Sequence, residues 1–228
     1  MRAVAIVPSA GRGLRMKSQV PKVLTPLLGR PLLAWTLEPI FQVGLFSEIL
    51  VACSPEDRPL INRFLSEEIG GSQPVRLIIG GETRQDSVAN CLREISGECE
   101  LVAIHDGARP LLTPQILLDV LHRADETGAA IAAVPCKDTV KVCDEEGIVT
   151  QTLDRSRLRL VQTPQCFRHS LIVSAYEKAQ REGFIATDDA AVAERMGAAV
   201  HVVMGSYENI KVTTPEDILI CEEILRRR

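Results

Sequence analysis

The sequence predicts an α/β fold with a mostly parallel, mixed sheet, and three observations support it. First, apolar runs alternate with amphipathic helical segments through the first 135 residues. Second, glycine and charged residues follow three of these runs, as is typical of ligand loops at the carboxyl ends of parallel strands. Third, the pattern changes at residues 137–159, where two short alternating segments flank a turn and predict a β-hairpin.

The first half of the chain supplies five expected strands, which are apolar on both faces as in buried parallel sheets: 3–7, 49–53, 75–79, 101–105 and 129–134. Helices are expected between them. They begin at Pro31, cover 57–69, run from Asp86 or Ser87 to about 95, and run from a Thr113–Pro114 cap to Gly128. The segment from Ser9 to Arg30 is left as a long irregular loop, and such loops are often functional.

The second half begins with the hairpin strands 139–142 and 148–152 around a turn at 144–147. Helices are expected at 170–182 and 189–196, strands at 200–204 and 210–212, and a last helix that starts with a capping box at Thr214–Asp217. We find no internal repeat and no linker. We therefore expect a single Rossmann-like three-layer domain over residues 1–228, with a protruding β-hairpin arm at about 137–159 that packs on a partner surface because isolated hairpins are barely stable.

Composition restricts the possible functions. The chain has 228 residues, of which 46% are hydrophobic and 25% charged, with a net charge of −4. A net negative charge disfavours a nucleic-acid or anionic-membrane partner. The N-terminus shows no signal peptide, and no apolar run reaches the roughly 18 residues of a membrane span. Seven scattered cysteines without a Cys-x-x-Cys pair, and four histidines without metal-ligand spacing, predict reduced thiols in a cytoplasmic protein.

The first loop, after the strand 3–7, is rich in small residues and cations. Small residues let backbone N–H groups approach an anion, so a phosphate-rich ligand is expected. Met16 stands where a dinucleotide-binding fingerprint needs its third glycine, and no Gly-Lys-Ser/Thr follows as in a P-loop. The alternative is a plain glycine turn with solvated basic residues. The residues concerned are Ser9, Ala10, Gly11, Arg12, Gly13, Arg15, Lys17 and Lys22.

Several motifs together resemble the cytidylyltransferases of 2-C-methyl-D-erythritol 4-phosphate, over nearly the whole chain. Three are long: Pro8–Met16 with Pro21 and Lys22, Gly80–Val88, and His105–Pro110. Shorter matches lie at 138–141, 154–155, 163–165, 187–189 and 209–213. Each match alone is weak, but the set is highly specific.

The resemblance implies a role for each matching position. Arg15 and Lys22 would stabilise the transition state at the α-phosphate of CTP, and Asp106 would bind Mg²⁺. Glu82 stands where the family often has Asp, which leaves its contact with the ribose or base open. Nucleotide binding would involve Pro8, Ala10, Gly11, Gly13, Gly81, Glu82, Ser87 and Ala108. The methylerythritol phosphate would be held by Arg109, Thr139, Arg155, Thr163, Thr187 and Lys211, with Arg155 and Lys211 on its phosphate.

The implied reaction transfers a cytidylyl group from CTP to 2-C-methyl-D-erythritol 4-phosphate and releases pyrophosphate, in non-mevalonate isoprenoid synthesis. It needs no general base, because the attacking phosphate oxygen is already anionic. The resemblance also implies a homodimer in which Arg155 of one arm reaches the neighbour's pocket. Two rivals remain: a ribitol 5-phosphate cytidylyltransferase, and a non-catalytic nucleotide-binding module.

Each position also has a structural alternative. Arg84 and Lys17 are expected to be solvated or structural, and His105 a packed strand residue. Instead of binding a ligand, Asp106 could cap the turn before Pro110, and Thr187 could cap the next helix. Lys211 could extend into solvent from an edge strand.

Overall fold

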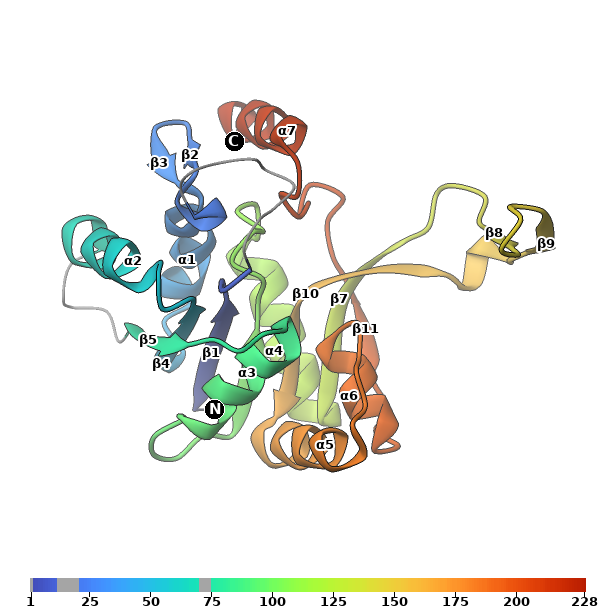
Figure 1. Ribbon diagram of the computed structural model, residues 1–228, viewed down its shortest axis with the longest axis horizontal. Coiled ribbons are helices and arrows are strands. Elements are labelled where there is room, and N and C mark those ends of the chain that lie inside the picture. Colours follow the sequence, from blue (N-terminus) through green and yellow to red (C-terminus); the bar gives the residue numbers. More distant parts are fainter. Residues whose placement is uncertain (1, 12–20, 70–74) are drawn as a thin grey trace.

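The computed structural model describes residues 2–11, 21–69 and 75–228. Its centre is a seven-stranded sheet with the strand order β11-β7-β10-β6-β1-β4-β5 (Figure 1). In this sheet β10 runs antiparallel to both neighbours, and the other pairings are parallel. The prediction of a mostly parallel, mixed sheet is confirmed. The strands are β1 (Ala3–Pro8), β4 (Phe46–Cys53), β5 (Val75–Ile79), β6 (Leu101–Ile104), β7 (Ala129–Pro135), β10 (Arg159–Arg168) and β11 (His201–Met204).

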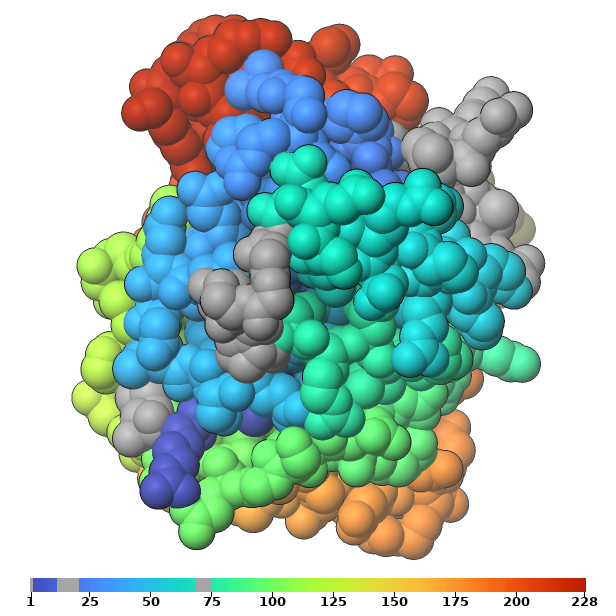
Figure 2. Space-filling view, turned by 90° about the vertical axis from the view of Figure 1, so that its left-hand side faces the viewer, coloured from blue at the N-terminus to red at the C-terminus, as the bar shows by residue number. Residues whose placement is uncertain are grey.

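Helices cover both faces of the sheet, so the expected three layers are present. One apolar core lies under α1 (Leu32–Val43), α2 (Arg58–Phe64), which continues into the π-helical turn η3 (Leu65–Ile69), and α4 (Pro114–Thr127). A second core lies under α3 (Arg84–Arg93), α5 (His169–Glu182) and α6 (Asp189–Arg195). Seen from the β5 side, α1 and α2 (blue to cyan) cover this end of the molecule, with α7 (Pro215–Arg227, red) above them (Figure 2).

Local capping explains where several helices begin. Thr113 accepts a hydrogen bond from the Ile116 N–H and α4 ends at Gly128 with φ 95°, as the sequence predicts. The start of α3 was expected at Asp86 or Ser87. It lies at Arg84, because Thr83 and Asp86 form a capping box. The structural alternative for Thr187, a cap on the next helix, is not realised, since the neighbouring Asp188 caps α6 by accepting from the Ala191 N–H.

Sequence patterning does not predict β10, which is the antiparallel strand in the middle of the sheet. Its pairing with β7 is interrupted between Val161 and Gln165, around Pro164. A proline has no N–H to donate to a β-ladder and is tolerated in a sheet at such irregularities. Its presence in the segment therefore argues against a strand when only the sequence is read. The backbone carbonyl of Thr163 in this gap accepts a hydrogen bond from Asn209 Nδ2 at 2.8 Å.

The predicted strand at 210–212 is wrong. These residues belong to no strand, although the Val212 N–H donates to the Ala108 carbonyl at 2.8 Å. The expectation of an irregular loop is wrong for residues 21–31, which contain the 3₁₀ turn η2 (Lys22–Leu24) and the small hairpin of β2 (Pro26–Leu27) and β3 (Arg30–Pro31). A third apolar cluster joins this hairpin to α7, and includes Leu27, Val212 and Cys221.

The hairpin arm projects from the body as predicted (Figure 1). It consists of β8 (Lys141–Cys143) and β9 (Val149–Thr152), followed by the 3₁₀ turn η4 (Arg155–Arg157), and every residue in the two strands is exposed. The seven cysteines are free thiols and five of them are buried. In the described part of the chain, no helix combines the length and hydropathy needed to span a bilayer.

Candidate active site

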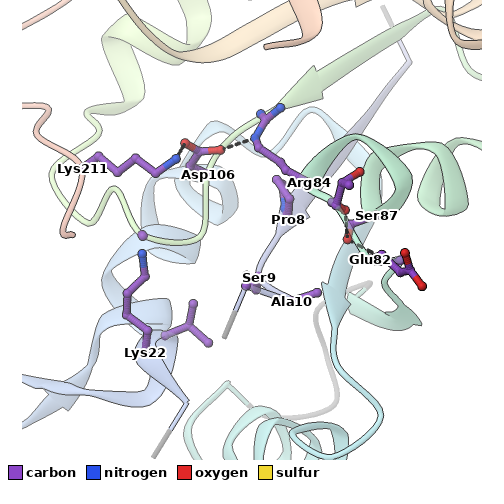
Figure 3. Close-up of a pocket in the computed structure, with 14 residues that line it drawn as sticks. Pro8, Ser9, Ala10, Lys22, Glu82, Arg84, Ser87, Asp106 and Lys211 are labelled. Carbon is purple, nitrogen blue, oxygen red and sulfur yellow. Dashed lines mark hydrogen bonds and ion pairs between the residues drawn. The ribbon is translucent and has the colours of Figure 1, made fainter. Parts of the chain in front are cut away.

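A cavity of about 160 Å³ lies at the carboxyl ends of β1 and β6, where open α/β sheets bind their ligands (Figure 3). It brings together predicted residues from four separate segments. These are Pro8, Ala10, Gly11, Lys22, Gly81, Glu82, Ser87, Asp106, Ala108 and Lys211. Ser9, which belongs to the first expected loop, also lines the cavity. Sequence reasoning did not assign a binding role to three more lining residues, which are Val23, Thr83 and Arg84.

Close packing of two loops forms one wall of this cavity. The Gly107 N–H donates to the Pro8 carbonyl at 3.2 Å. A Cβ on Gly107 would lie 2.1 Å from Ser9 Oγ and 3.3 Å from the Pro8 carbonyl oxygen. A side chain at position 107 would therefore force the Ser9 hydroxyl to turn away and the Pro8 carbonyl to shift slightly, so the loops after β1 and β6 are closely packed.

The second glycine loop, after β5, is tied to the start of α3. The Gly81 N–H donates to Ser87 Oγ at 3.1 Å, and Ser87 Oγ–H donates to the Thr83 carbonyl at 2.9 Å. A Cβ on Gly81 would lie 2.2 Å from Asp86 Cβ. Ser87 thus shapes the loop as well as lining the cavity, while Glu82 extends from the loop beside it.

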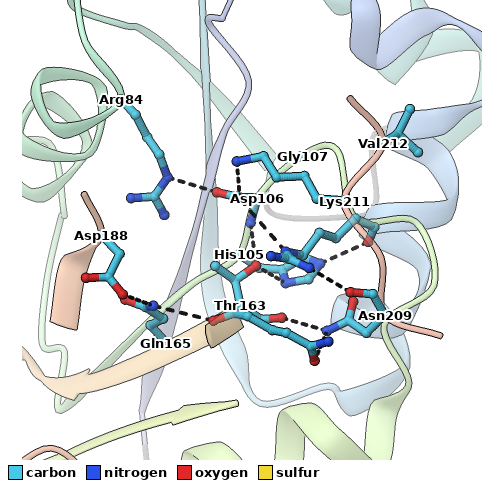
Figure 4. Close-up of polar contacts among 12 residues, drawn as sticks. Arg84, His105, Asp106, Gly107, Thr163, Gln165, Asp188, Asn209, Lys211 and Val212 are labelled. Atoms are coloured by element: carbon cyan, nitrogen blue, oxygen red, sulfur yellow. Dashed lines mark hydrogen bonds and ion pairs between the residues drawn. The ribbon is translucent and has the colours of Figure 1, made fainter. Parts of the chain in front are cut away.

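Asp106 is the centre of a charged cluster beneath the cavity (Figure 4). Its Oδ1 accepts from Arg84 Nε at 2.9 Å, and its Oδ2 forms an ion pair with Lys211 Nζ at 2.7 Å. Burial on its own would raise the pKa of Asp106, but Arg84 and Lys211 lower it well below the ordinary value. The side chain, only 8% exposed, is therefore a carboxylate at neutral pH. The turn-cap alternative leaves these ion pairs unexplained.

Arg84 was expected to be solvated or structural, and the structure supports the structural alternative, since its guanidinium is held in ion pairs. It lines the cavity and also forms a two-pronged ion pair with Asp189, at 3.0 Å and 2.7 Å. Burial opposes its charge, but Asp189 and Asp106 raise its pKa above the ordinary value. The sequence did offer one sign that Arg84 lies at the cavity, because Arg84 directly follows the glycine loop at the end of a predicted strand.

His105 fixes the loop from behind and is buried, as expected for a packed residue. Its Nε2 lies 3.1 Å from the Arg109 carbonyl, which can only accept, so Nε2 carries the proton. Nδ1 therefore accepts from the Thr163 hydroxyl at 3.0 Å, and that hydroxyl accepts from the Asp106 N–H at 3.0 Å. Burial lowers the pKa of His105 to about 4, so the ring is neutral. Thr163, which the resemblance assigns to the substrate, uses its hydroxyl to hold Asp106 in place.

The remaining cations are also anchored. Lys22 Nζ donates to the Val212 carbonyl at 3.0 Å. Arg109 Nη1 donates to the Asn209 carbonyl at 2.6 Å, and burial lowers its pKa. Lys211 does not extend from an edge strand, because its ammonium group contacts Asp106. These contacts tie residues 209–212 to the loop after β6.

Other predicted residues lie away from this cavity within the chain. Thr139 and Arg155 are exposed on the arm, where Arg155 Nη1 donates to the Lys137 carbonyl at 2.7 Å. Thr187 is exposed before α6. Arg15 and Gly13 lie outside the described residues, as do Arg12 and Lys17.

The donor set around Asp106 fits one particular kind of metal binding. Within the described residues no group of three or more His, Cys, Asp or Glu side chains could hold a metal ion. A carboxylate offers about four lone-pair positions, and the Asp106 oxygens each accept one close cationic donor. One protein carboxylate suits a magnesium ion that keeps waters and phosphate oxygens as its other ligands. The residues therefore fit a metal that arrives with a phosphate ligand.

Comparison with known proteins agrees with this geometry. The sequence profile of the 2-C-methyl-D-erythritol 4-phosphate cytidylyltransferase family matches residues 3–227. Curated proteins of that name are 41% identical over 227 residues in Caldanaerobacter subterraneus, covering 100% of both chains, and 44% identical over 229 residues in Geotalea uraniireducens, covering 99% of this chain and 97% of the relative.

Solved structures with similar names have the same fold. The 4-diphosphocytidyl-2C-methyl-D-erythritol synthase of Anaerococcus prevotii superposes with a TM-score of 0.86 at 33% identity, covering 99% of both chains. The 2-C-methyl-D-erythritol 4-phosphate cytidylyltransferase of Francisella tularensis gives 0.83 at 30% identity, over 98% of this chain and 99% of the other. With these matches over its full length, the chain belongs to the 2-C-methyl-D-erythritol 4-phosphate cytidylyltransferase family.

Proposed function

We propose that this protein transfers a cytidylyl group from CTP to 2-C-methyl-D-erythritol 4-phosphate. The products are 4-diphosphocytidyl-2-C-methyl-D-erythritol and pyrophosphate, in the non-mevalonate route to isoprenoid precursors. One observation supports the proposal beyond family membership: Lys22 and Lys211 converge with two glycine loops on a single cavity at the strand ends. This arrangement suits a ligand that carries several phosphates.

The geometry supports an in-line displacement. A phosphate oxygen of the polyol phosphate attacks the α-phosphorus of CTP, the new P–O bond forms, and the bond to pyrophosphate breaks. Lys22, together with Arg15, neutralises the charge that develops on the α-phosphate oxygens. No side chain has to remove a proton, which agrees with a buried, neutral His105. The glycine loops after β1 and β5 hold the nucleotide with their backbone groups, with Gly81, Glu82 and Ser87 beside its cytidine.

Magnesium is part of the proposal. Asp106 would hold the ion through one carboxylate oxygen, and the triphosphate would supply further ligands. When bound, Mg²⁺ neutralises negative charge on the triphosphate. The ionised state of Asp106 at neutral pH supports this role.

Turnover with defined substrates tests the function. Purified enzyme with CTP and Mg²⁺ should release pyrophosphate with 2-C-methyl-D-erythritol 4-phosphate and much more slowly with ribitol 5-phosphate. Faster release with ribitol 5-phosphate would assign the rival activity. Tight CTP binding without pyrophosphate release under either polyol phosphate would indicate a nucleotide-binding module instead.

We also propose that the active unit is a homodimer joined through the arm. Apolar side chains are exposed on the arm and its base, and also along the edge strand β11, which supports a covered surface. These are Val142, Ile148, Val149, Leu160, Val161, Val202 and Met204. Arg155 and Thr139 are exposed and do not line the cavity of their own chain, so they would serve a neighbour's pocket.

Complementation between two defective chains tests this shared site. Lys22→Ala and Arg155→Ala homodimers should each be nearly inactive. When the chains are unfolded together and refolded, half of the dimers should be mixed, and each mixed dimer has one pocket with neither defect. Activity should therefore recover to about a quarter of wild type. Recovery of no activity would mean that Arg155 serves its own chain's pocket, and each variant refolded alone is the control.

The remaining partners follow from charge and composition. The proposed substrates are small anionic molecules bound in a local basic pocket, and a net charge of −4 does not favour nucleic acid or an anionic membrane. Seven free thiols suit a reducing compartment, so we place the enzyme in the cytoplasm.

A further inference from the structure

A buried chain of polar contacts lies behind the cavity and ends on Asp106, and two of its members, Tyr176 and Asp189, have no part in the proposed chemistry. Asp189, the first residue of α6, is 0% exposed and accepts both Nη groups of Arg84. The Tyr176 hydroxyl on α5 donates to Asp189 Oδ1. Arg84 Nε then donates to Asp106 Oδ1. The contacts run from the core of the molecule to the carboxylate at the cavity.

Arg84 uses three nitrogen atoms to bridge two carboxylates, which a lysine could not do. Because both Nη groups are bound to Asp189, the guanidinium presents Nε to Asp106. Tyr176 stays protonated, since burial and Asp189 raise its pKa well above the ordinary value, and it can donate at any physiological pH. Each member therefore holds the next one in a single orientation.

Arg84 also lines the cavity, with 27% of its side chain exposed. An arginine at this position has a second possible partner, because the proposed triphosphate would be a strong competitor for its guanidinium. The two hydrogen bonds from the Arg84 Nη groups to Asp189 prevent a contact between the guanidinium and the triphosphate. Asp189 itself does not line the cavity.

We propose that Asp189, anchored by Tyr176, is a positioning residue that neutralises Arg84, turns it away from the triphosphate and keeps its Nε on Asp106. The inference rests on the proposed function, because it assigns CTP to the cavity. Asp189 touches neither substrate and acts through Arg84. Its loss should release a cation toward the nucleotide while Asp106 loses its fixed orientation.

The test compares Asp189→Asn with the adjacent Asp188→Asn. Asp188 accepts from the Ala191 N–H with Oδ1 and from Gln165 Nε2 with Oδ2; asparagine keeps the helix cap and loses only the neutral bond from Gln165, with no ion pair broken. It is therefore a matched control. CTP affinity is measured by calorimetry without polyol phosphate, and kcat and KM by pyrophosphate release. Asp189→Asn should bind CTP several-fold more tightly and lower kcat about tenfold, the signature of a non-productive contact. Asp188→Asn should change neither quantity by more than about twofold.

A purely structural role for Asp189 predicts a different result. Loss of folded protein lowers kcat and the binding stoichiometry together, with CTP affinity unchanged or weaker, and that outcome would overturn the proposal. Tyr176→Phe keeps the buried ring and removes only the hydroxyl. It should therefore also bind CTP more tightly and lower kcat, to a smaller extent, even if Asp189→Asn does not fold. Wild-type affinity and kcat in Tyr176→Phe and Asp189→Asn would also overturn it. Failure of the proposed function would instead appear as a wild-type enzyme without turnover.

Discussion

Gly81→Ala provides the sharpest test of how the second glycine loop is built. The added Cβ would lie 2.2 Å from Asp86 Cβ and 3.2 and 3.3 Å from Asp86 backbone atoms, whereas ordinary contacts begin at 3.4 Å. The Cβ–Cβ separation must therefore grow by 1.2 Å. Asp86 cannot give way easily, because its carboxylate accepts from the Thr83 N–H at 3.1 Å and from the Thr83 hydroxyl at 2.8 Å.

The loop has to move away from α3 by roughly this distance. Overpacking of this kind costs about 1–3 kcal/mol of the free energy of unfolding, which lowers the melting temperature by about 3–9 °C in a chain of this size. A shift of about 1 Å in a positioning element reduces catalysis about 100-fold. We expect kcat/KM for CTP to fall by that factor, because Gly81 and Glu82 line the cavity.

Thermal unfolding and pyrophosphate release measure the two effects. Gly11→Ala is the matched comparison, because a Cβ there meets nothing within 4 Å among the described residues. Its melting temperature should stay within about 1 °C of wild type, and a raised KM for CTP would report a direct ligand contact. A Gly81→Ala enzyme with wild-type kcat/KM would refute the reasoning, since the loop would then tolerate the displacement.

Three further predictions concern charge. Lys22→Ala should lower kcat by about 100- to 1,000-fold, the range for one preorganised transition-state contact, with little change in melting temperature; a variant that stays active would remove Lys22 from the mechanism. Asp106→Asn should weaken the dependence of activity on Mg²⁺, and an unchanged magnesium titration would leave Asp106 as a structural residue. His105, whose pKa falls from 6.5 to about 4 on folding, binds fewer protons in the native state. The free energy of unfolding should therefore decrease as pH drops from 6.5 to 4, by up to about 3 kcal/mol. Denaturant titration at several pH values should show this decrease in the free energy of unfolding in the wild type and not in His105→Asn. An equal decrease in both proteins would contradict the lowered pKa of His105.

Some features of this protein follow from short stretches of sequence. The apolar runs that became β1, β4, β5, β6 and β7 are recognisable because a buried parallel strand must be apolar on both faces. The cap at Thr113 and the capping box at Thr214–Asp217 were also predictable, since their hydrogen bonds join residues three positions apart. The glycine loops at the strand ends located the cavity, because the carboxyl ends of parallel strands meet at one edge of the sheet.

Long-range contacts decided the rest. β10 was not predicted because its local pattern does not indicate a strand. It is a strand because it pairs with β7 on both sides of Pro164 and with β6 after Pro164. The segment 210–212 reads as a strand, but the chain uses it to place Lys211 on Asp106. Arg84 and Asp189 are 105 positions apart, and only the fold, which brings the first residue of α6 to the first residue of α3, joins them. The sequence by itself determined the apolar parallel strands, the caps at Thr113 and Thr214 and the position of the cavity, because these depend on periodicity and on bonds between near neighbours. The tertiary structure alone decided which charges meet inside it, because an ion pair between distant residues leaves no local pattern in the sequence.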